Sequence, residues 1–255
     1  MLFRSLALLV VEGRKSVLTS HGQTLLARGR ALVKELETLE ALARSLKQGW
    51  ESELKLIVDA AFPRSRLLNI VAELQSSCPS TQIQLEDVVL SGAEQAIIEG
   101  TGDLVVTSRV PPGYLSDWLL DVNFVAVARA DHPLLQIGRE LTTDDLAHHV
   151  QAVVRDSGTA HPRDEGWLGA AQRFTVSSLD ASLATILAGL AYAWLPEHAL
   201  AEPLRSGALR RLPLVSGASR IVSLHIVLVH ANVLGPAARV AADAFHRHAK
   251  AQVNG

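Results

Sequence analysis

A seven-residue repeat of leucines marks the first fifty residues. Between Gly22 and Gly49 there is no proline, and only Gly29 interrupts a run of strong helix formers, so we predict a helix over residues 21–49. Its apolar positions form a narrow seam suited to a second helix, which predicts dimerisation through Leu25, Leu32, Leu36, Leu39 and Leu46. The alternative is that the seam packs on the chain's own domain, as in most amphipathic helices. The length of the helix favours a partner helix.

From Glu51 onward, short apolar strands alternate with helical segments, which is typical of an α/β fold. Ser91 and Glu94 have the spacing of a capping box at the start of one helix. The number of elements fits two α/β lobes. The expected strands are residues 54–58, 82–89, 103–106, 122–128, 151–154, 173–176, 191–196 and 223–230, and the expected helices are residues 63–77, 91–98, 142–149, 178–189, 197–204 and 235–250.

Composition narrows the class of protein. A chain of 255 residues with 48% hydrophobic content can form one or two domains with a real core. The net charge of -2 gives no global attraction to nucleic acid, so any such contact needs a local patch. A single cysteine, Cys78, excludes an intrachain disulfide and fits a reducing cytosol. No apolar run reaches the roughly 18 residues of a membrane span, and we expect a cytoplasmic protein without membrane contact.

Several short segments, in this order, resemble the LysR-type transcriptional regulators. Residues 13–19 followed by Gly22 resemble the wing and exit of that family's winged helix-turn-helix, and residues 53–56 resemble the first strand of its effector domain. Glu99-Gly100 with Asp103-Leu104 resembles its E-G-x-x-D-L segment, and Asp131-His132-Pro133-Leu134 resembles its D/E-H-P-L turn. The stretch from Gly189 to Pro196 resembles the G-x-G-x-x-x-L-P region, with Ala191 in place of the second glycine.

The resemblance implies a dimeric or tetrameric regulator that binds a small-molecule effector and uses no cofactor. It implies an α/β fold in which a two-lobed, periplasmic-binding-protein-like (type 2) effector domain follows a long linker helix. We assign residues 1–20 to a remnant of the winged helix-turn-helix and residues 21–49 to the linker. Lobe I then comprises residues 51–123 plus 223–255, lobe II comprises residues 124–222, and the effector lies in the cleft between them.

Strand ends indicate which residues face this cleft, because ligands of open α/β sheets bind beyond the carboxyl ends of strands, near helix N-termini. Hydroxyls and helix N-termini favour an anion, and Arg155 can form a bidentate pair with a carboxylate. The alternative is structural: Ser91 and Ser177 cap helices, and Arg155 makes a surface salt bridge. The predicted effector-binding residues are Asp59, Phe62, Ser91, Thr107, Ser108, Arg155, Ser157, Ser177 and Ser178.

Contacts with an operator are predicted at Arg14, Lys15 and Thr19, which can touch phosphates as a wing does. A complete winged helix-turn-helix needs a longer segment before the linker, so we expect most of that domain to be missing and operator binding to require it. The leading hypothesis is a LysR-type regulator that senses a small anionic metabolite. The alternative is a free-standing small-molecule-binding or dominant-negative dimerising protein that does not bind DNA.

An enzyme on the same fold is the third hypothesis, and the sequence gives it little support. There is no G-x-S-x-G elbow, phosphate loop or dinucleotide fingerprint. His148 and His149 lack a partner at metal-ligand spacing, so no metal site is expected. Asp164 and Glu165 lie in a hydrophilic loop and are expected to be solvated rather than to act as acid and base.

Overall fold

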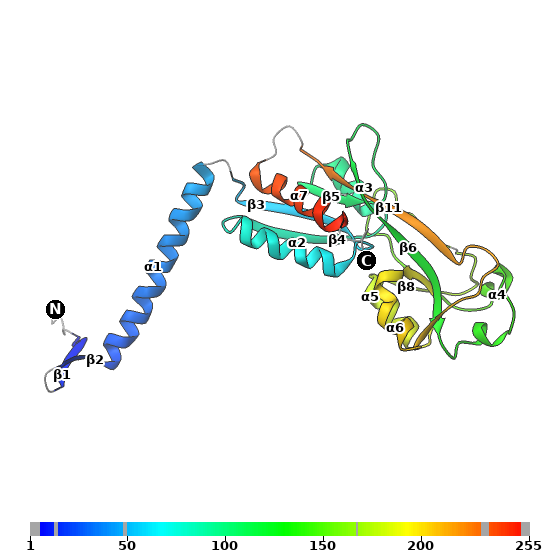
Figure 1. The fold of residues 1–255 in the computed structure, drawn as a ribbon, viewed down its shortest axis with the longest axis horizontal. Coiled ribbons are helices and arrows are strands. Elements are labelled where there is room, and N and C mark those ends of the chain that lie inside the picture. Colours follow the sequence, from blue (N-terminus) through cyan, green and yellow to red (C-terminus); the bar gives the residue numbers. More distant parts are fainter. Residues whose placement is uncertain (1–5, 13–14, 48–49, 167, 231–234, 251–255) are drawn as a thin grey trace. The chain divides into compact units, whose positions relative to one another are not determined.

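The structure is a computed structural model that describes residues 6–12, 15–47, 50–166, 168–230 and 235–250 (Figure 1). The chain divides into two compact units, residues 1–52 and residues 53–255. Each unit is described here by itself. No helix in these ranges is both long enough and apolar enough to span a bilayer.

The first unit consists of a hairpin and a long helix. Strands β1 (Leu9–Glu12) and β2 (Lys15–Leu18) pair antiparallel, and helix α1 (Ser20–Lys47) follows. Thr19 begins the helix, because its hydroxyl accepts a hydrogen bond from the backbone N–H of Gly22 at 3.0 Å and donates one to the carbonyl of Ala7 at 2.8 Å. Gly22 has no room for a side chain, since a Cβ there would lie 2.1 Å from the carbonyl oxygen of Leu8. The hairpin and the start of the helix therefore form one packed corner.

The leucine seam lies along α1. Leu25, Leu32 and Leu36 are all exposed, Leu32 by 66% of its surface. The side chains of Leu39 and Leu46, the other two predicted contacts, lie outside the described residues. Three exposed leucines on one seam of a helix present the apolar surface that a partner helix would need.

The second unit holds the other strands and helices. Its strands are β3 (Glu53–Asp59), β4 (Gln82–Val88), β5 (Leu104–Thr107), β6 (Asp117–Arg129), β7 (Gln151–Val154), β8 (Arg173–Val176), β9 (Ala193–Pro196), β10 (Leu209–Arg211) and β11 (Ser219–Leu228). Its helices are α2 (Arg64–Ser77), α3 (Ser91–Glu99), α4 (Thr143–Ala147), α5 (Leu179–Leu187), α6 (Ala201–Arg205) and α7 (Pro236–Lys250), with 3₁₀ turns η1 (Pro133–Gln136) and η2 (Glu197–Leu200).

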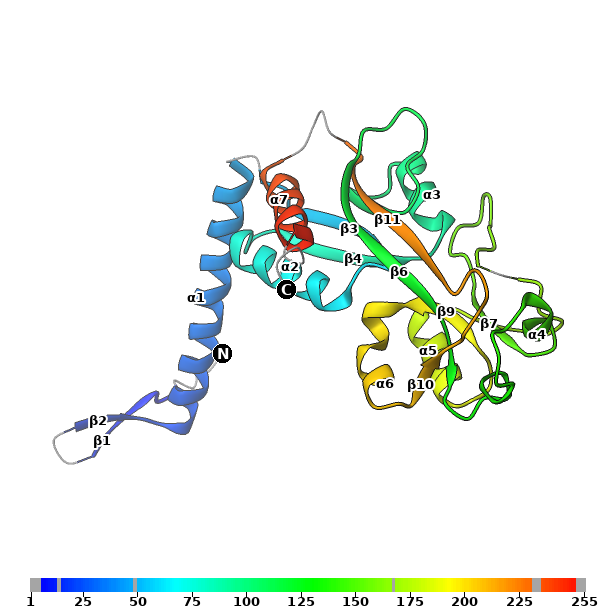
Figure 2. The ribbon, with the colours of Figure 1, turned by 45° about the vertical axis from the view of Figure 1, so that its right-hand side comes forward.

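These elements form two lobes (Figure 2). In one lobe, β4, β3 and β5 run parallel, and α2 and α7 lie side by side in both views, with the rings of Phe62 and Phe245 5.5 Å apart. In the other lobe, β7 and β8 pair in parallel, and a bridge between Gln151 and Tyr192 joins them to the segment that leads into β9. Each lobe has its own apolar core, around Ile57, Ile97 and Val105 in the first and around Val127, Ile186 and Leu195 in the second.

Two long strands, β6 and β11, connect the lobes (Figure 2). They pair antiparallel from Ser219 opposite Val125 to Ile226 opposite Asp117, with a shift of register between Leu224 and His225. At one end β11 pairs with β5, and at the other end β6 pairs with β9 and β10. The paired crossing strands β6 and β11 therefore belong to the sheets of both lobes.

The main differences from the sequence-based elements concern these crossing strands. β6 begins at Asp117 rather than Val122, and β11 begins at Ser219 rather than Ser223. The extra residues are partly polar, so no apolar run marks them, yet the ladder and a 2.7 Å hydrogen bond from Ser223 to Asp121 keep them extended. Strand β10 was not predicted at all, since its sequence, Leu-Arg-Arg, has little β pattern without its partner β6.

Candidate functional site

A cavity of about 80 Å³ lies where the two lobes meet over the crossing strands. Asp59 ends β3 and Ser108 follows β5 in the first lobe. Gln151 and Ser182 come from β7 and α5 of the second, and Arg220 lies at the start of β11. Polar groups from three parts of the fold therefore face one small space. The other lining residues are Ala60, Ala61, Val89, Leu90, Phe124, Ala152, Val153, Val154, Glu165, Gly166, Leu179, Trp194 and Val222.

Asp59 is the acidic group of the first lobe. It is the last residue of β3 and only 7% exposed, and its Oδ1 accepts a 2.9 Å hydrogen bond from the backbone N–H of Ala61. Burial, with a smaller contribution from the nearby Glu165, raises the pKa of the Asp59 carboxyl to about 6 against the opposing effects of Ala61, Ser108 and Arg220. A buried carboxyl whose pKa is raised toward neutral pH inside a cavity is typical of binding sites.

Three of the residues that line the cavity each have a buried polar atom without a hydrogen-bond partner in the described protein: Gln151 (Oε1), Ser182 (Oγ) and Arg220 (Nε). Gln151 is 3% exposed and Ser182 is 1% exposed. A buried polar group left unpaired costs about 1–3 kcal/mol. Two such atoms in one lobe and a third on the crossing strand indicate a space built for a polar guest rather than for apolar packing.

Arg220 is held in place by two contacts. Its Nη1 lies 3.0 Å from Oε2 of Glu165, and its guanidinium carbon lies 4.8 Å from the centroid of the Phe124 ring, a cation–π geometry. Glu165 is exposed, as expected for a loop carboxylate, and it also forms an ion pair with Arg220. Its neighbour Asp164 does remain largely exposed, beside Arg173.

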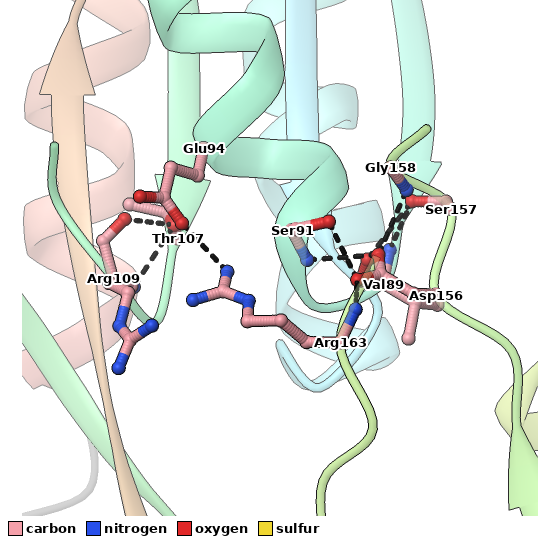
Figure 3. A network of polar contacts seen from close by, with 9 residues as sticks. All are labelled: Val89, Ser91, Glu94, Thr107, Arg109, Asp156, Ser157, Gly158 and Arg163. Carbon is pink, nitrogen blue, oxygen red and sulfur yellow. Dashed lines mark hydrogen bonds and ion pairs between the residues drawn. The ribbon is translucent and has the colours of Figure 1, made fainter. Parts of the chain in front are cut away.

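The loop that follows β7 folds back onto the N-terminus of α3 (Figure 3). The carboxylate of Asp156 accepts hydrogen bonds from the backbone N–H and hydroxyl of Ser91, at 3.0 and 2.6 Å, and from the backbone N–H groups of Gly158 and Arg163, at 2.8 and 2.7 Å. Burial tends to raise the pKa of the Asp156 carboxyl, but these four donors outweigh it and hold the pKa below its usual value. The chain thus places its own anion at the start of α3.

Other contacts strengthen this arrangement, which we call the α3 clasp and define as residues 156–163 on residues 89–95. The hydroxyl of Ser157 donates to the carbonyl of Val89 at 3.0 Å and accepts from its N–H at 2.9 Å (Figure 3). Arg163 forms a 2.7 Å ion pair with Glu94, and both side chains are mostly buried. The clasp therefore holds the loop after β7 on the start of α3 through both side-chain and backbone contacts.

The clasp requires close backbone approach. A Cβ at Gly92 would lie 2.0 Å from Ser157 Oγ, and a Cβ at Gly158 would lie 2.1 Å from Ser91 Oγ. Leu90, which precedes the helix, has a φ of 52°, a left-handed conformation that is costly for a residue with a branched side chain. The predicted Ser91–Glu94 capping box was wrong: Leu90 is the N-cap, and the Ser91 hydroxyl donates to Asp156 instead.

The structure places four of the nine predicted effector-binding residues in these two features. Asp59 and Ser108 line the cavity, whereas Ser91 and Ser157 belong to the α3 clasp. Ser157 also borders an adjoining groove of about 370 Å³, which shares the lining residues Ala60, Val89 and Leu179 with the cavity. The other members of the predicted set that border this groove are Phe62, Ser177 and Ser178.

The remaining side chains have local roles or lie elsewhere. Ser178 caps α5, since its hydroxyl accepts from the N–H of Ala181 at 3.1 Å. Thr107 is fully buried and bonds the backbone of Arg109 in both directions. Arg155 is exposed and borders a third hollow of about 610 Å³. The predicted set is thus split among several sites.

Sequence reasoning missed Gln151, Ser182 and Arg220. Each lies within an element, whereas the rule that was applied selects residues beyond strand ends. A signal did exist for two of them: Gln151 opens the buried strand Gln-Ala-Val-Val, and Ser182 lies one helical turn before Ile186, which is fully buried. A polar residue at a core position of an element requires a partner, and here none is described in the chain.

His132 and His149 lie side by side in the second lobe. Nδ1 of His132 accepts a hydrogen bond from the N–H of Leu134, and its ring lies 5.2 Å from that of His149. Burial and the neighbouring His149 lower the pKa of His132. The part of the chain that the structure describes contains no group of three or more metal-ligating side chains.

Comparison with known proteins gives the family. The LysR substrate binding domain matches residues 47–250. The probable HTH-type transcriptional regulator YhaJ of Escherichia coli K12 is 28% identical over 204 residues, which are 78% of this chain and 68% of the relative. The uncharacterised HTH-type regulator YeeY of the same strain is 28% identical over 210 residues, which are 80% of this chain and 68% of the relative.

Solved structures share the fold at low identity. ArgP from Mycobacterium tuberculosis superposes with a TM-score of 0.62 at 19% identity, covering 95% of this chain and 82% of ArgP. The LysR-type regulator CrgA from Neisseria meningitidis gives a TM-score of 0.60 at 17% identity, covering 96% of this chain and 84% of CrgA. The CcmR regulatory domain of Synechocystis, solved with 2-PG, gives 0.59 at 15% identity, covering 78% of this chain and 98% of that domain.

Fold, cavity and comparisons together define an effector-binding domain of the transcriptional regulators. The chain belongs to the LysR family. The predicted class, a two-lobed α/β effector domain of the periplasmic-binding-protein type, is confirmed.

Replacing Asp59 with asparagine tests the raised pKa. Between the unfolded value of about 4 and the folded value of about 6, the folded carboxyl keeps a proton that the unfolded chain releases, so stability falls as pH rises through this window. A shift of this size corresponds to roughly 2–3 kcal/mol at full ionisation. In urea unfolding, Asp59→Asn should therefore exceed the wild type by about 1–2 kcal/mol at pH 7.5, with little difference at pH 4.

The matched control is Asp87→Asn, an exposed carboxyl paired with Arg64. It should give no such gain at pH 7.5. An Asp59→Asn variant whose stability runs parallel to the wild type from pH 4 to 7.5 would contradict a buried, perturbed Asp59.

Replacing Asp156 with asparagine tests the α3 clasp. The amide group would oppose two of the N–H donors with a donor of its own, so unfolding in urea should require about 1–3 kcal/mol less free energy. Proteolytic cleavage should appear in the loop over residues 156–166 before global unfolding. Asp164→Asn changes a neighbouring exposed carboxyl in the same way and should leave both readouts near the wild type. Equal behaviour of the two variants would show that the clasp does not hold the loop.

Proposed function

We propose that this LysR-type regulator senses a small metabolite in the cavity between its lobes and that binding changes the arrangement of its dimer. The observation that carries the proposal is the pair of almost fully buried, unpartnered polar atoms of Gln151 and Ser182 that line the cavity. A guest that supplies their hydrogen bonds would bind with a gain that an empty apolar pocket does not offer. Solved relatives support the idea of a bound effector, since LysG of Corynebacterium glutamicum is described with bound effector Arg.

The lobe boundaries are part of this proposal. We assign residues 51–123 plus 223–255 to lobe I and residues 124–222 to lobe II. Support comes from strand pairing, because His225 to Leu228 of β11 pair with β5, whereas β6 pairs with β9 from Phe124 onward. The two strands therefore change partners close to the proposed crossings.

The sequence favoured an anionic effector, and the side chains of the cavity argue against a simple anion. Asp59 and Glu165 both line it, and the one guanidinium, that of Arg220, is already paired with Glu165. The helix N-terminus that was expected to hold a ligand anion holds the carboxylate of Asp156 instead. An effector that carries only negative charge would meet repulsion from the Asp59 side.

The first unit supplies the proposed dimer and DNA contacts. We propose that the seam of α1 pairs with a second copy, and that the β1–β2 hairpin touches DNA phosphates through Lys15, which is exposed opposite Glu12. The Thr19 hydroxyl is already used within the hairpin corner, so it contributes less to DNA contact than was expected. Arg14 lies outside the described residues. Such a regulator would act in the cytoplasm without catalysing a reaction.

The alternative remains a small-molecule-binding or dominant-negative dimerising protein. It shares the cavity and the α1 seam with the regulator and differs only in making no DNA contact. The family match and the names of the relatives favour the regulator.

Filling the cavity tests effector binding. Val222 lines the cavity, while the preceding residue, Ile221, is 71% exposed on the opposite face of β11. A thermal-shift screen of small acids, amines and amino acids should give ligands that raise the melting temperature of the wild type and of Ile221→Phe. Val222→Phe should lose the shift. A ligand that stabilises all three proteins equally would place its site elsewhere.

Replacing Leu32 and Leu36 with aspartate tests the seam. Two charges on the apolar line should weaken self-association at least tenfold in analytical ultracentrifugation, because each would have to be buried against the partner helix. Arg30→Ala alters charge on a different face of α1 and serves as the control. If the double variant associates like the wild type, the seam does not form the dimer.

A further inference from the structure

The polar groups of the cavity lie at two poles. Asp59 and Ser108 belong to the first lobe, and Gln151 and Ser182 belong to the second. The walls between them are largely apolar and include the rings of Phe124 and Trp194. At about 80 Å³ the space is far smaller than the roughly 300–1,000 Å³ of typical drug-sized sites. A guest of this cavity must therefore be compact.

Hydrogen-bonding capacity indicates what the guest must carry. Gln151 Oε1 can only accept, and so can the ionised carboxylate of Asp59. Arg220 Nε can only donate, while Ser182 Oγ can do either. A guest that satisfies these groups must therefore carry hydrogen-bond donors on one part and acceptors on another. A hydrocarbon or a simple ether would leave the acceptor atoms of the protein unpaired.

Charge narrows the choice further. A guest with only a carboxylate would face Asp59 and Glu165, with one arginine to offset them. An amine alone would pair with Asp59 but leave Arg220 Nε without an acceptor. A molecule with both an ammonium and a carboxylate meets both needs, because the ammonium has three donors and the carboxylate only accepts.

We propose that the effector is a small zwitterion of the size and chemistry of a short-chain free amino acid. Its ammonium donates to Asp59 and to Gln151 Oε1, and its carboxylate accepts from Arg220 Nε and Ser182 Oγ. The ammonium bonds a residue of each lobe, so the ligand bridges the cleft. This inference rests on the proposed function, since it assigns the chemistry of the same cavity.

Three matched probes test the inference on the full chain at pH 7.5: L-alanine, propionate, which lacks the ammonium, and ethylamine, which lacks the carboxylate. Isothermal titration should show binding of L-alanine, with propionate and ethylamine at least about tenfold weaker, because each loses a charge-assisted pair worth more than 1 kcal/mol. L-Serine should bind comparably to L-alanine, since it differs only by a hydroxyl.

Asp59→Asn supplies the residue-level test. This substitution should weaken the binding of L-alanine about tenfold or more, because the ammonium loses its charged partner. The variant should remain folded, since the same change is expected to raise stability at this pH. The control Asp87→Asn should bind L-alanine like the wild type. The wild type should bind L-alanine more weakly at pH 5 than at pH 7, because protonation of Asp59 competes with the ammonium of the ligand. Asp59→Asn should remove most of this pH dependence. The other groups that face Asp59 and act on its pKa are Ser108, Glu165 and Arg220.

The outcomes separate this inference from the proposed function. If propionate binds as well as L-alanine and Val222→Phe abolishes its binding, the cavity is the effector site and the zwitterion inference falls. The same holds if no small amino acid binds while another compound shows binding that Val222→Phe removes. If no compound shows binding that depends on Val222, both proposals fail together.

Discussion

The antiparallel pairing of β6 with β11 is the constraint on which the rest of the second unit depends. Both strands pass from one lobe to the other, and their ladder satisfies the backbone hydrogen bonds of the crossing. Because opposite residues share a face of the sheet, the pairing of Arg220 with Phe124 stacks the guanidinium on the ring and brings Val222 to the same side. A one-residue slip of β11 would turn Arg220 and Val222 away from the cavity.

Two aspartates in neighbouring features show how environment decides the state of one chemical group. Asp59 is desolvated and accepts one hydrogen bond from the backbone, so burial prevails and its pKa rises to about 6. Asp156 is also partly buried, but it accepts from Ser91, Gly158 and Arg163, and these donors stabilise its charged form. One carboxylate is thus available for a ligand's proton or positive charge, whereas the other is already committed to holding two segments together.

Local patterns predicted most elements, because helices and strands with a regular apolar period carry their signal within a few residues. The cavity as a whole has no such signal, since its polar residues come from six separate elements and loops. Even where the strand-end rule applied, it could not separate Thr107 from Ser108, whose side chains point in opposite directions along an extended chain. The prediction for Arg155 was wrong for another reason. The loop after β7 turns toward α3, and the hydrogen bonds between Asp156 and Ser91 fix this turn.

The segment that enters α3 belongs to both the cavity and the clasp, and this gives a physical route from ligand to lobe arrangement. Val89 and Leu90 line the cavity, while the backbone of Val89 is bonded by Ser157 and the residue after Leu90 is bonded by Asp156. The left-handed φ of Leu90 must be held by these contacts, because the residue gains nothing from it locally. A guest that packs on this segment acts on the clasp only through its difference in affinity for the closed and opened states. Contacts with both lobes provide such a difference, whereas contacts with one lobe alone do not.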